Sequence, residues 1–584
     1  MRAVSSLGGF LTSAFFGRAR RVTTCTALAL SAGMLLASPA VAEPAEPGPR
    51  TFVKQAPRDD STTPVLDMSQ PAVEQGTART AAATAVVRPR FDVTGDGKTD
   101  LVHRRWTGWT FVAPSNGAAA TVFDEPHGSG LSFDLVPLGD QNGTGKPELL
   151  TLAEDGVLRL YSESTLTGGS ITWSGKGWTL YNKIFSPGDI SGDGKADLLA
   201  RQHNGDLYYY RWTGAASAPF AGRVKIGGGW GVYDQLVGVG DNSGDGRGDV
   251  VARTTDGKLY FYGSTGDPRA PFKPRRELGK GWNTYNQILA PDDRNGDGRA
   301  DLLARDAAGA LWAYSGLGNG SYSARAKLSG SWFDVDQFAS AGNVPTNGKR
   351  GILARDKAGT VFEYRHRNGG KLGARDQVGP TGYFAGASVS FASALDPGPI
   401  SDLLEVYQGH LYSNGSVDLG GGWQIYNLIV GPGDLTGDGK ADLVARDRTG
   451  VLYLYPGNGK GTAVASRIRV GDGWSAYNRV LGAGDFSGDG RTDLLARDGS
   501  GTLWLYRGTG SATAPFAKRV SLGGGWNTYN KLAAPGDMSG DGKADLLAVN
   551  SAGDLYRYLG TGTGATLTPR VKIGYGYQTY GDLY

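Results

Sequence analysis

The sequence is almost without cysteine, since Cys25 is the one cysteine among 584 residues. It lies in a segment that carries Arg2 and a basic pair, continues in an apolar run and ends in Ala40-Val41-Ala42, the small-x-small form of a signal peptidase site. We therefore expect residues 1–42 to be a secretory signal peptide, cleaved after Ala42, and the mature protein to be secreted and extracellular. A mature chain without thiols cannot form disulfides, so metal ions are the obvious alternative stabiliser.

The mature chain also lacks an excess of charge of either sign. The full sequence has a formal net charge of +4, and residues 1–42 hold four arginines and no acidic residue. Cleavage therefore brings the net charge to zero, which gives no electrostatic reason to expect a nucleic-acid partner. No stretch after residue 42 approaches the run of about 18 apolar residues that a membrane span needs.

Residues 43–83 are rich in Pro, Ala, Thr, Glu and Gln and show no hydrophobic periodicity. Such a composition is typical of a flexible segment that cannot bury enough apolar surface to fold. We predict a disordered linker here.

The rest of the chain contains a repeat of roughly 50 residues. Each unit begins like GDISGDGKADLLAR, at residues 188–201, and continues through a Gly turn into an aromatic run such as LYYYRW. In these runs Tyr208 and Tyr210, like Trp504 and Tyr506, alternate with leucine at period two, which indicates a β-strand. Units of about four short strands that recur at this spacing are typical of β-propeller blades.

We count ten such units, whereas a propeller ring usually has about 4 to 8 blades. We therefore predict an all-β fold of two five-bladed propellers in tandem, over residues 84–330 and 331–584. One seven- or eight-bladed ring with extra blades is the alternative.

The repeated loop places three carboxylates, Asp189, Asp193 and Asp197, around two glycines. Counting Asp189 as position 1, side-chain oxygens fall at positions 1, 3, 5 and 9, and the carbonyl of position 7 can add another ligand. Six to eight hard oxygens suit Ca²⁺, and a strand rather than a helix follows position 9, which excludes an EF-hand. We predict about seven structural calcium sites, formed by Asp92, Thr94, Asp96, Lys98 and Asp100; Asp189, Ser191, Asp193, Lys195 and Asp197; Asp241, Ser243, Asp245, Arg247 and Asp249; Asp293, Asn295, Asp297, Arg299 and Asp301; Asp434, Thr436, Asp438, Lys440 and Asp442; Asp485, Ser487, Asp489, Arg491 and Asp493; and Asp537, Ser539, Asp541, Lys543 and Asp545.

Three loops depart from this pattern. The loop from Asp140 keeps oxygens but has Glu148 at position 9, so it is a weak candidate. The loop from Asn343 has no carboxylate, and the loop from Asp396 is shortened to DPGPISDLLEV, so we assign calcium to neither.

The tandem motif D-x-[STN]-G-D-G-x-x-D-L resembles the FG-GAP or VCBS repeats of integrin α-chain propellers and of many secreted bacterial proteins. The resemblance covers nearly all of residues 90–584. It implies a propeller in which each complete loop binds Ca²⁺ through the side chains at positions 1, 3, 5 and 9 and the carbonyl at position 7.

A second repeated motif is Gly-Trp-x-x-Tyr, often followed by Asn. Together with RVKIG it resembles the repeat of tachylectin-type five-bladed lectins, which implies sugar pockets between neighbouring blades. Either these aromatic residues pack between blades, or some of them stack on sugar rings while Asn or Asp accepts hydroxyl hydrogen bonds. The candidate ligand-binding residues are Trp178, Tyr181, Trp230, Tyr233, Trp282, Tyr285, Trp423, Tyr426, Trp474, Tyr477, Trp526 and Tyr529.

Catalytic motifs are missing. The histidines His103, His127, His203, His366 and His410 have no spacing of a metal site or triad, and the chain has no Gly-x-Ser-x-Gly, His-Glu-x-x-His or P-loop. We predict no catalytic residue and a calcium-stabilised, monomeric binding protein for an extracellular glycan or protein. A hydrolase or lyase with a propeller-channel active site, and a protein-interaction scaffold, are the alternatives.

Overall fold

The computed structural model shows an all-β protein, as the sequence predicts. It describes residues 48–50, 88–105, 109–125, 132–153, 156–215, 217–328, 330–343, 351–367, 370–396, 401–539 and 543–584. The expected signal peptide, most of the expected linker and Asp541 lie outside these residues. Within the expected linker, the Arg50 backbone N–H donates to the Glu405 carboxylate at 2.7 Å. No helix in the described part of the chain is long and apolar enough to span a membrane.

The repeat units form four-stranded antiparallel sheets. Strands in the middle of a sheet, such as β9 (Asp197–Gln202), are buried along almost their whole length. The aromatic runs, such as β10 (Leu207–Tyr210), alternate buried and half-buried residues, which is the period of two that the sequence shows. The four-stranded organisation of the units is therefore confirmed.

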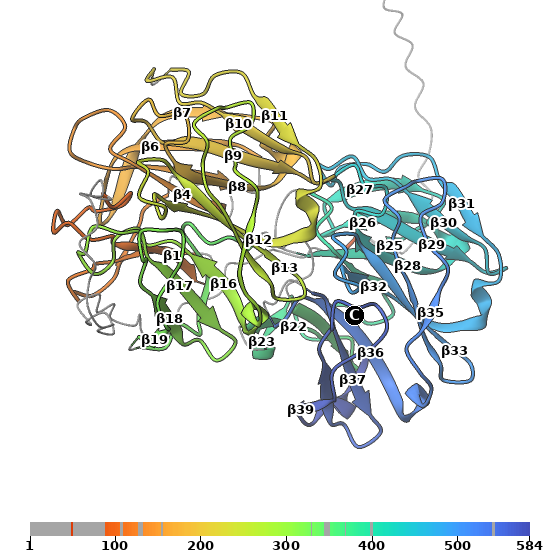
Figure 1. Ribbon diagram of the computed structural model, residues 1–584. Helices are drawn as coiled ribbons and strands as arrows, with labels where there is room; N and C mark the ends of the chain where they lie inside the picture. The colour runs from red at the N-terminus through yellow and green to blue at the C-terminus, as the bar shows by residue number, and fades with distance from the viewer. Residues whose placement is uncertain are drawn as a thin grey trace, which may run out of the picture. The chain divides into compact units, whose positions relative to one another are not determined.

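The sheets fall into two sets of five. The first set, coloured orange to green in Figure 1, contains β20 (Val335–Phe338), β1 (Leu101–Arg105), β2 (Thr110–Ala113) and β3 (Thr121–Val122); β4 (Ser132–Gly139), β5 (Glu148–Ala153), β6 (Leu158–Thr165) and β7 (Gly168–Gly175); β8 (Tyr181–Gly188), β9, β10 and β11 (Val224–Gly227); β12 (Tyr233–Gly240), β13 (Asp249–Thr254), β14 (Leu259–Tyr262) and β15 (Arg276–Gly279); and β16 (Tyr285–Leu289), β17 (Leu302–Asp306), β18 (Leu311–Tyr314) and β19 (Ala326–Lys327).

The second set, coloured green to blue, contains β40 (Tyr580–Leu583), β21 (Gly351–Asp356), β22 (Val361–Arg367) and β23 (Lys371–Val378); β24 (Ser388–Ala392), β25 (Asp402–Tyr407), β26 (His410–Ser413) and β27 (Val417–Gly421); β28 (Tyr426–Gly433), β29 (Asp442–Asp447), β30 (Leu452–Tyr455) and β31 (Ile468–Gly471); β32 (Tyr477–Gly484), β33 (Asp493–Asp498), β34 (Leu503–Tyr506) and β35 (Val520–Ser521); and β36 (Tyr529–Gly536), β37 (Asp545–Asn550), β38 (Leu555–Tyr558) and β39 (Val571–Gly574). One parallel pair, Ala392 with Gly431, joins two of these sheets.

In each set a late strand completes an early sheet. β20 pairs with β1, and the C-terminal strand β40 pairs with β21. In the first set, neighbouring sheets touch through β4, β8, β12 and β16, and β20 also contacts β4. In the second set they touch through β24, β28, β32, β36 and β40. A hydrophobic cluster of Leu353, Val361, Phe391 and Leu403 connects the β21 sheet to the β24 sheet. These contacts favour two closed rings, which we call the first ring (residues 88–343) and the second ring (residues 351–584).

The pairing of β20 moves the expected boundary between the rings. Residues 331–343 were expected in the second propeller, but β20 belongs to the first ring, and the second ring begins with β21. The reason is that ring closure uses a strand taken from beyond the fifth unit. At the start of that strand Val335 stands where the other units have the tyrosine of Trp-x-x-Tyr, and only Trp332 remains of the motif. The sequence therefore does not show that this strand corresponds to the inner strand of the other units.

A short 3-10 turn opens most inner strands, and the Gly-Trp pair of the motif forms it. The glycine before each turn has a φ of 82° to 90°, a left-handed conformation that favours glycine over other residues. The described turns are η1 (Trp178–Leu180), η2 (Trp230–Val232), η3 (Trp282–Thr284), η4 (Trp423–Ile425), η5 (Trp474–Ala476), η6 (Trp526–Thr528) and η7 (Tyr577–Thr579).

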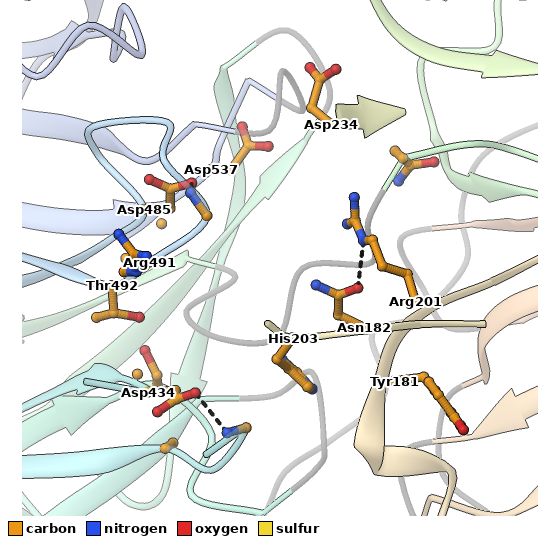
Figure 2. A pocket seen from close by; sticks show the side chains of 18 of the residues that line it. Tyr181, Asn182, Arg201, His203, Asp234, Asp434, Asp485, Arg491, Thr492 and Asp537 are labelled. Carbon is orange, nitrogen blue, oxygen red and sulfur yellow. Dashed lines mark hydrogen bonds between the residues drawn. The ribbon is translucent and has the colours of Figure 1, made fainter. Parts of the chain in front are cut away.

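The arginine of the DLLAR segment ties each sheet to the next. Arg201 of β9 donates through Nη1 to the carbonyl oxygens of Trp230 and Tyr233, at 3.0 and 2.6 Å, in the following sheet. Its Nε donates to Asn182 Oδ1 at 3.0 Å, as Figure 2 shows. The motif asparagine that was considered as a sugar ligand thus positions an arginine. The same arginine-to-carbonyl bonds recur at Arg253, Arg305, Arg446 and Arg497.

Replacing this arginine should destabilise the protein. Arg201 is 3% exposed, so Arg201→Met leaves two carbonyl oxygens without a donor, and we expect the free energy of unfolding to fall by about 3 kcal/mol. Denaturant titration followed by tryptophan fluorescence measures the change. Arg446 makes the same bonds, at 2.9 and 2.8 Å, but is only half-buried, so water can replace them and Arg446→Met should cost less. Equal losses at the two positions would contradict a role for burial.

Candidate functional site

The acidic loops have one geometry in both rings. The position 1 carboxylate accepts hydrogen bonds from the backbone N–H groups of positions 4 and 6, as Asp189 does from Gly192 and Gly194, both at 2.6 Å. Both glycines have a φ of 82°, a conformation that a β-carbon would strain. The same pair of bonds is made by Asp92, Asp140, Asp241, Asp293, Asp434 and Asp485.

The position 9 carboxylate ties the loop to its own sheet. Asp197 Oδ2 accepts from the N–H groups of Ile190 and Ser191, each at 3.1 Å, and Oδ1 accepts from the Trp212 N–H, also at 3.1 Å. Even the shortened loop keeps part of this arrangement, because Asp402 Oδ2 accepts from the Leu395 N–H at 2.7 Å. Position 9 therefore has a structural role that does not depend on a metal.

The position 5 carboxylate faces the loop's own backbone and basic side chains. Asp193 Oδ1 accepts from the Lys195 N–H at 3.0 Å, so the position 7 residue forms a tight turn back onto position 5. Asp245 Oδ2 lies 3.0 Å from Lys273 Nζ. Within the described residues, no three His, Cys, Asp or Glu side chains are gathered closely enough to hold a metal ion. In the six predicted sets that the structure describes in full, the three carboxylates of a loop are bound to different partners.

Burial makes these carboxylates costly to ionise. Desolvation, followed by backbone hydrogen bonds that partly oppose it, raises the pKa of Asp249, Asp301 and Asp493 to about 7. The pKa of Asp485 rises to about 8, because burial is reinforced by the charge of Asp493. Negative charges that raise each other's pKa indicate a site whose charge a bound cation would compensate.

Position 3 offers a further test of whether a cation fits. The side-chain oxygens of Ser243 and Ser487 are buried and make no hydrogen bond within the described part of the chain. Ser191 Oγ, in contrast, donates to Asp189 Oδ1 at 3.2 Å. A buried hydroxyl oxygen with an open lone pair beside carboxylates is a suitable ligand for a hard cation. The chemistry of these oxygens therefore suits calcium, while the described carboxylates are not gathered around a common centre.

One loop carries its own cation. Arg294 occupies position 2, where the other complete loops have uncharged residues, and its buried Nε lies 3.7 Å from Asp301 Oδ2. The guanidinium supplies part of the positive charge that a metal would supply elsewhere. The loop from Asp293 should therefore depend least on calcium.

The aromatic motif packs between neighbouring sheets. Trp230 and Val250 share a hydrophobic cluster with Leu199 and Leu207 of the preceding sheet, and the ring centroids of Trp230 and Tyr262 are 4.9 Å apart. The tryptophans of five copies are 3–8% exposed, while Trp282 is half-buried. Their ring faces are thus occupied by protein, so packing accounts for the repeated Trp-Tyr pairs. The five are Trp178, Trp230, Trp423, Trp474 and Trp526.

The polar edge of this cluster is a tyrosine pair capped by an arginine. In one copy Arg223 Nη1 donates to Tyr181 OH at 2.8 Å, and that hydroxyl lies 2.5 Å from Tyr210 OH. The Arg223 guanidinium also stacks over the Tyr208 ring, with Cζ 4.5 Å from the ring centre. Among the residues that the structure describes, the arginines in this position are Arg223, Arg275, Arg325, Arg375, Arg467, Arg519 and Arg570. All seven are exposed.

The sequence family of the repeat agrees with this geometry. The family model for FG-GAP-like repeats matches residues 189–252, 434–496 and 485–548. The chain contains FG-GAP-like repeats. Each matched segment begins at position 1 of an acidic loop and ends in the strand after the next loop. No curated protein matches the sequence.

Several solved structures are distantly similar to this chain. BBS1N, from a complex with ARL6DN soaked with lead, is 14% identical over 66% of this chain and 94% of its own, with a TM-score of 0.23. The BP39L lectin from Burkholderia pseudomallei is 13% identical over 76% and 99%, with a TM-score of 0.23. Sqt1 from Saccharomyces cerevisiae is 11% identical over 77% and 98%, with a TM-score of 0.21. These similarities say nothing of a ligand.

Sequence reasoning missed one copy of the aromatic cluster and all of its arginines. In the seventh copy Tyr580 from the C-terminal strand bonds to Tyr364 OH at 2.6 Å and accepts from Arg375 at 3.1 Å. Its partners lie more than 200 residues apart, and Tyr577 replaces the tryptophan. The arginine of each cluster lies at or just before the RVKIG segment of its unit. Its recurrence in every such unit was the signal in the sequence that could have identified it.

Proposed function

We propose that this protein is a secreted, calcium-stabilised propeller protein that binds carbohydrate at pockets repeated between neighbouring blades. The observation that supports it is a pocket of about 450 Å³ where the connection from β35 to β36 meets the β36–β39 sheet, lined by Trp526, Tyr529, Tyr558 and Arg570. The Trp526 and Tyr529 rings are packed within the protein, so the groups offered to a ligand are the tyrosine hydroxyls and the exposed Arg570 guanidinium, and a few fixed polar groups in an apolar hollow are typical of small-ligand sites. The same Arg-Tyr-Tyr arrangement occurs in seven copies.

Calcium would act on the fold rather than on the ligand. In each complete loop the side chains of positions 1, 3, 5 and 9 would hold the ion, with the carbonyl of position 7. For the second copy these are Asp189, Ser191, Asp193 and Asp197, with Lys195. The ion would compensate the buried carboxylates and fix the turn that leads into the second strand of each blade.

Repetition gives the proposal a stoichiometry that can be measured. We expect a glycan array in calcium buffer to identify oligosaccharides that bind, and calorimetry with the smallest of them to give close to seven sites per chain. Weak single sites would bind a polymer strongly through avidity. A count of one site, or no carbohydrate binding at all, would contradict the proposal.

A matched pair of variants assigns the sites. Arg570→Gln should lower the number of sites by about one while the melting temperature stays unchanged, because the guanidinium is exposed. Arg448 is also exposed but lies outside the seven clusters, so Arg448→Gln should leave the site count as it is.

A further inference from the structure

The polar groups of each Arg-Tyr-Tyr cluster are mainly hydrogen-bond donors. In the last copy Arg570 Nη1 donates to Tyr529 OH at 2.7 Å, and Tyr529 OH lies 2.5 Å from Tyr558 OH. Two hydroxyls carry two protons and their mutual bond uses one, so one hydroxyl proton is left over in each cluster. The guanidinium has five N–H donors, and this contact uses one. A ligand that supplies acceptors is therefore favoured.

The positive charge of the seven arginines is not neutralised within the protein. No acidic side chain pairs with any of them in the described part of the chain, whereas the neighbouring Lys225 and Lys572 pair with Asp206 and Asp554. Each guanidinium lies over an aromatic ring, with Cζ 4.0 to 4.7 Å from the ring centre. Stacking fixes the planar fork that binds a carboxylate or sulfate in a bidentate manner.

We propose that these pockets bind the negative groups of an acidic polysaccharide, with carboxylate or sulfate oxygens on the arginine fork. The inference rests on the proposed carbohydrate binding and names its ligand class. Each stacked guanidinium and leftover hydroxyl proton forms a donor pair for one anionic group, while the sugar ring lies in the pocket beside it.

The arrangement of the seven sites suits a polymer. The first ring holds Arg223, Arg275 and Arg325, and the second holds Arg375, Arg467, Arg519 and Arg570. A polysaccharide with a negative group on each repeating unit can occupy several of these sites at once, so affinity rises with chain length. Because the mature chain has no net charge, the attraction comes from the pockets and not from the protein as a whole.

The test uses polymers that differ only in their negative groups. Hyaluronan and its carboxyl-reduced form test for carboxylate, and dextran sulfate and dextran test for sulfate. We expect the full protein in calcium buffer to bind the charged member of at least one pair and not its neutral counterpart. Equal binding to the charged and neutral members would overturn the acidic ligand class and leave carbohydrate binding intact. If the array shows binding to neutral glycans only, the acidic ligand class is likewise overturned and carbohydrate binding stands. If no polymer or glycan binds, both proposals are overturned.

Charge-matched variants separate the pockets from general attraction. Replacing Arg467, Arg519 and Arg570 by Gln should weaken binding to the acidic polymer by about tenfold or more, since charged hydrogen bonds are lost at three sites. Replacing Lys357, Arg448 and Lys460 by Gln removes the same charge from exposed positions outside the clusters and should change binding by less than about twofold. Equal losses in the two triple variants, with unchanged melting temperatures, would overturn the pocket assignment.

Discussion

Chelation of calcium is expected to lower the melting temperature of this protein by about 10–20 °C. If free calcium is about tenfold above the dissociation constant, each site contributes roughly 1.4 kcal/mol. Four complete loops in the first ring then contribute about 5–6 kcal/mol, and three in the second about 4 kcal/mol. Such sums are comparable to the net stability of a whole domain. Differential scanning calorimetry of the metal-free and calcium-loaded protein measures the shift.

Two loop variants make the chelation result specific. Asp245→Asn should remove one site and with it part of the stabilisation by calcium. Asp297→Asn should have a smaller effect on the calcium-dependent shift, since Arg294 already lies 3.7 Å from Asp301 in that loop. An unchanged melting temperature in excess chelator, after metal removal is verified by elemental analysis, would rule out calcium as the stabiliser.

The buried loop carboxylates should make a contribution to the stability of the metal-free protein that falls as pH rises. Burial raises the pKa of Asp249, Asp301 and Asp493 to about 7, so the folded state binds these protons more tightly than the unfolded state does. The stabilisation that these three groups give the chelated protein is therefore fully present below the ordinary carboxyl pKa and is lost as pH rises through about 7. With saturating calcium, which competes with protons, stability should instead fall as pH is lowered.

The sequence could predict what is local in this fold. Strands such as β10 follow from the alternation of Leu207 with Tyr208 and Tyr210, and the loop geometry follows from carboxylates and glycines a few residues apart. The hydrogen bonds of Asp189 to Gly192 and Gly194 lie within six residues of chain. Such features depend on neighbours in the sequence, so their pattern recurs unchanged in each unit.

The rest depends on contacts between distant residues. The hydrogen bond from Arg201 to the carbonyl of Trp230 crosses from one sheet to the next. The alternation of residues along a single strand does not predict such a bond. Ring closure was hidden for the same reason, since β20 meets β1 only after 230 residues of intervening chain and its motif is eroded. The tryptophans were visible as a motif, but whether their faces were open or packed depended on the neighbouring sheet.

Deleting residues 575–584 is expected to unfold the second ring. The deletion removes η7 and β40, which supply Tyr577, Tyr580 and Leu583 to a cluster with Ile352 and Leu547. Burying three such side chains is worth about 1.5–3 kcal/mol each, and β21 also loses its hydrogen-bonded partner. The total approaches the 5–15 kcal/mol by which a typical domain is stable.

Calorimetry of the full chain should show unfolding of both rings. Calorimetry of the truncated protein should show one transition only, from the first ring, because that ring keeps β20. Tyr575→Ala in the full chain is the control, because Tyr575 is 84% exposed and its loss should change nothing. A synthetic peptide of residues 575–584, added in excess, should restore the missing transition by pairing with β21. If the truncated protein melts like the full chain, β40 does not close the ring. If the first ring is lost as well, the two rings do not fold independently.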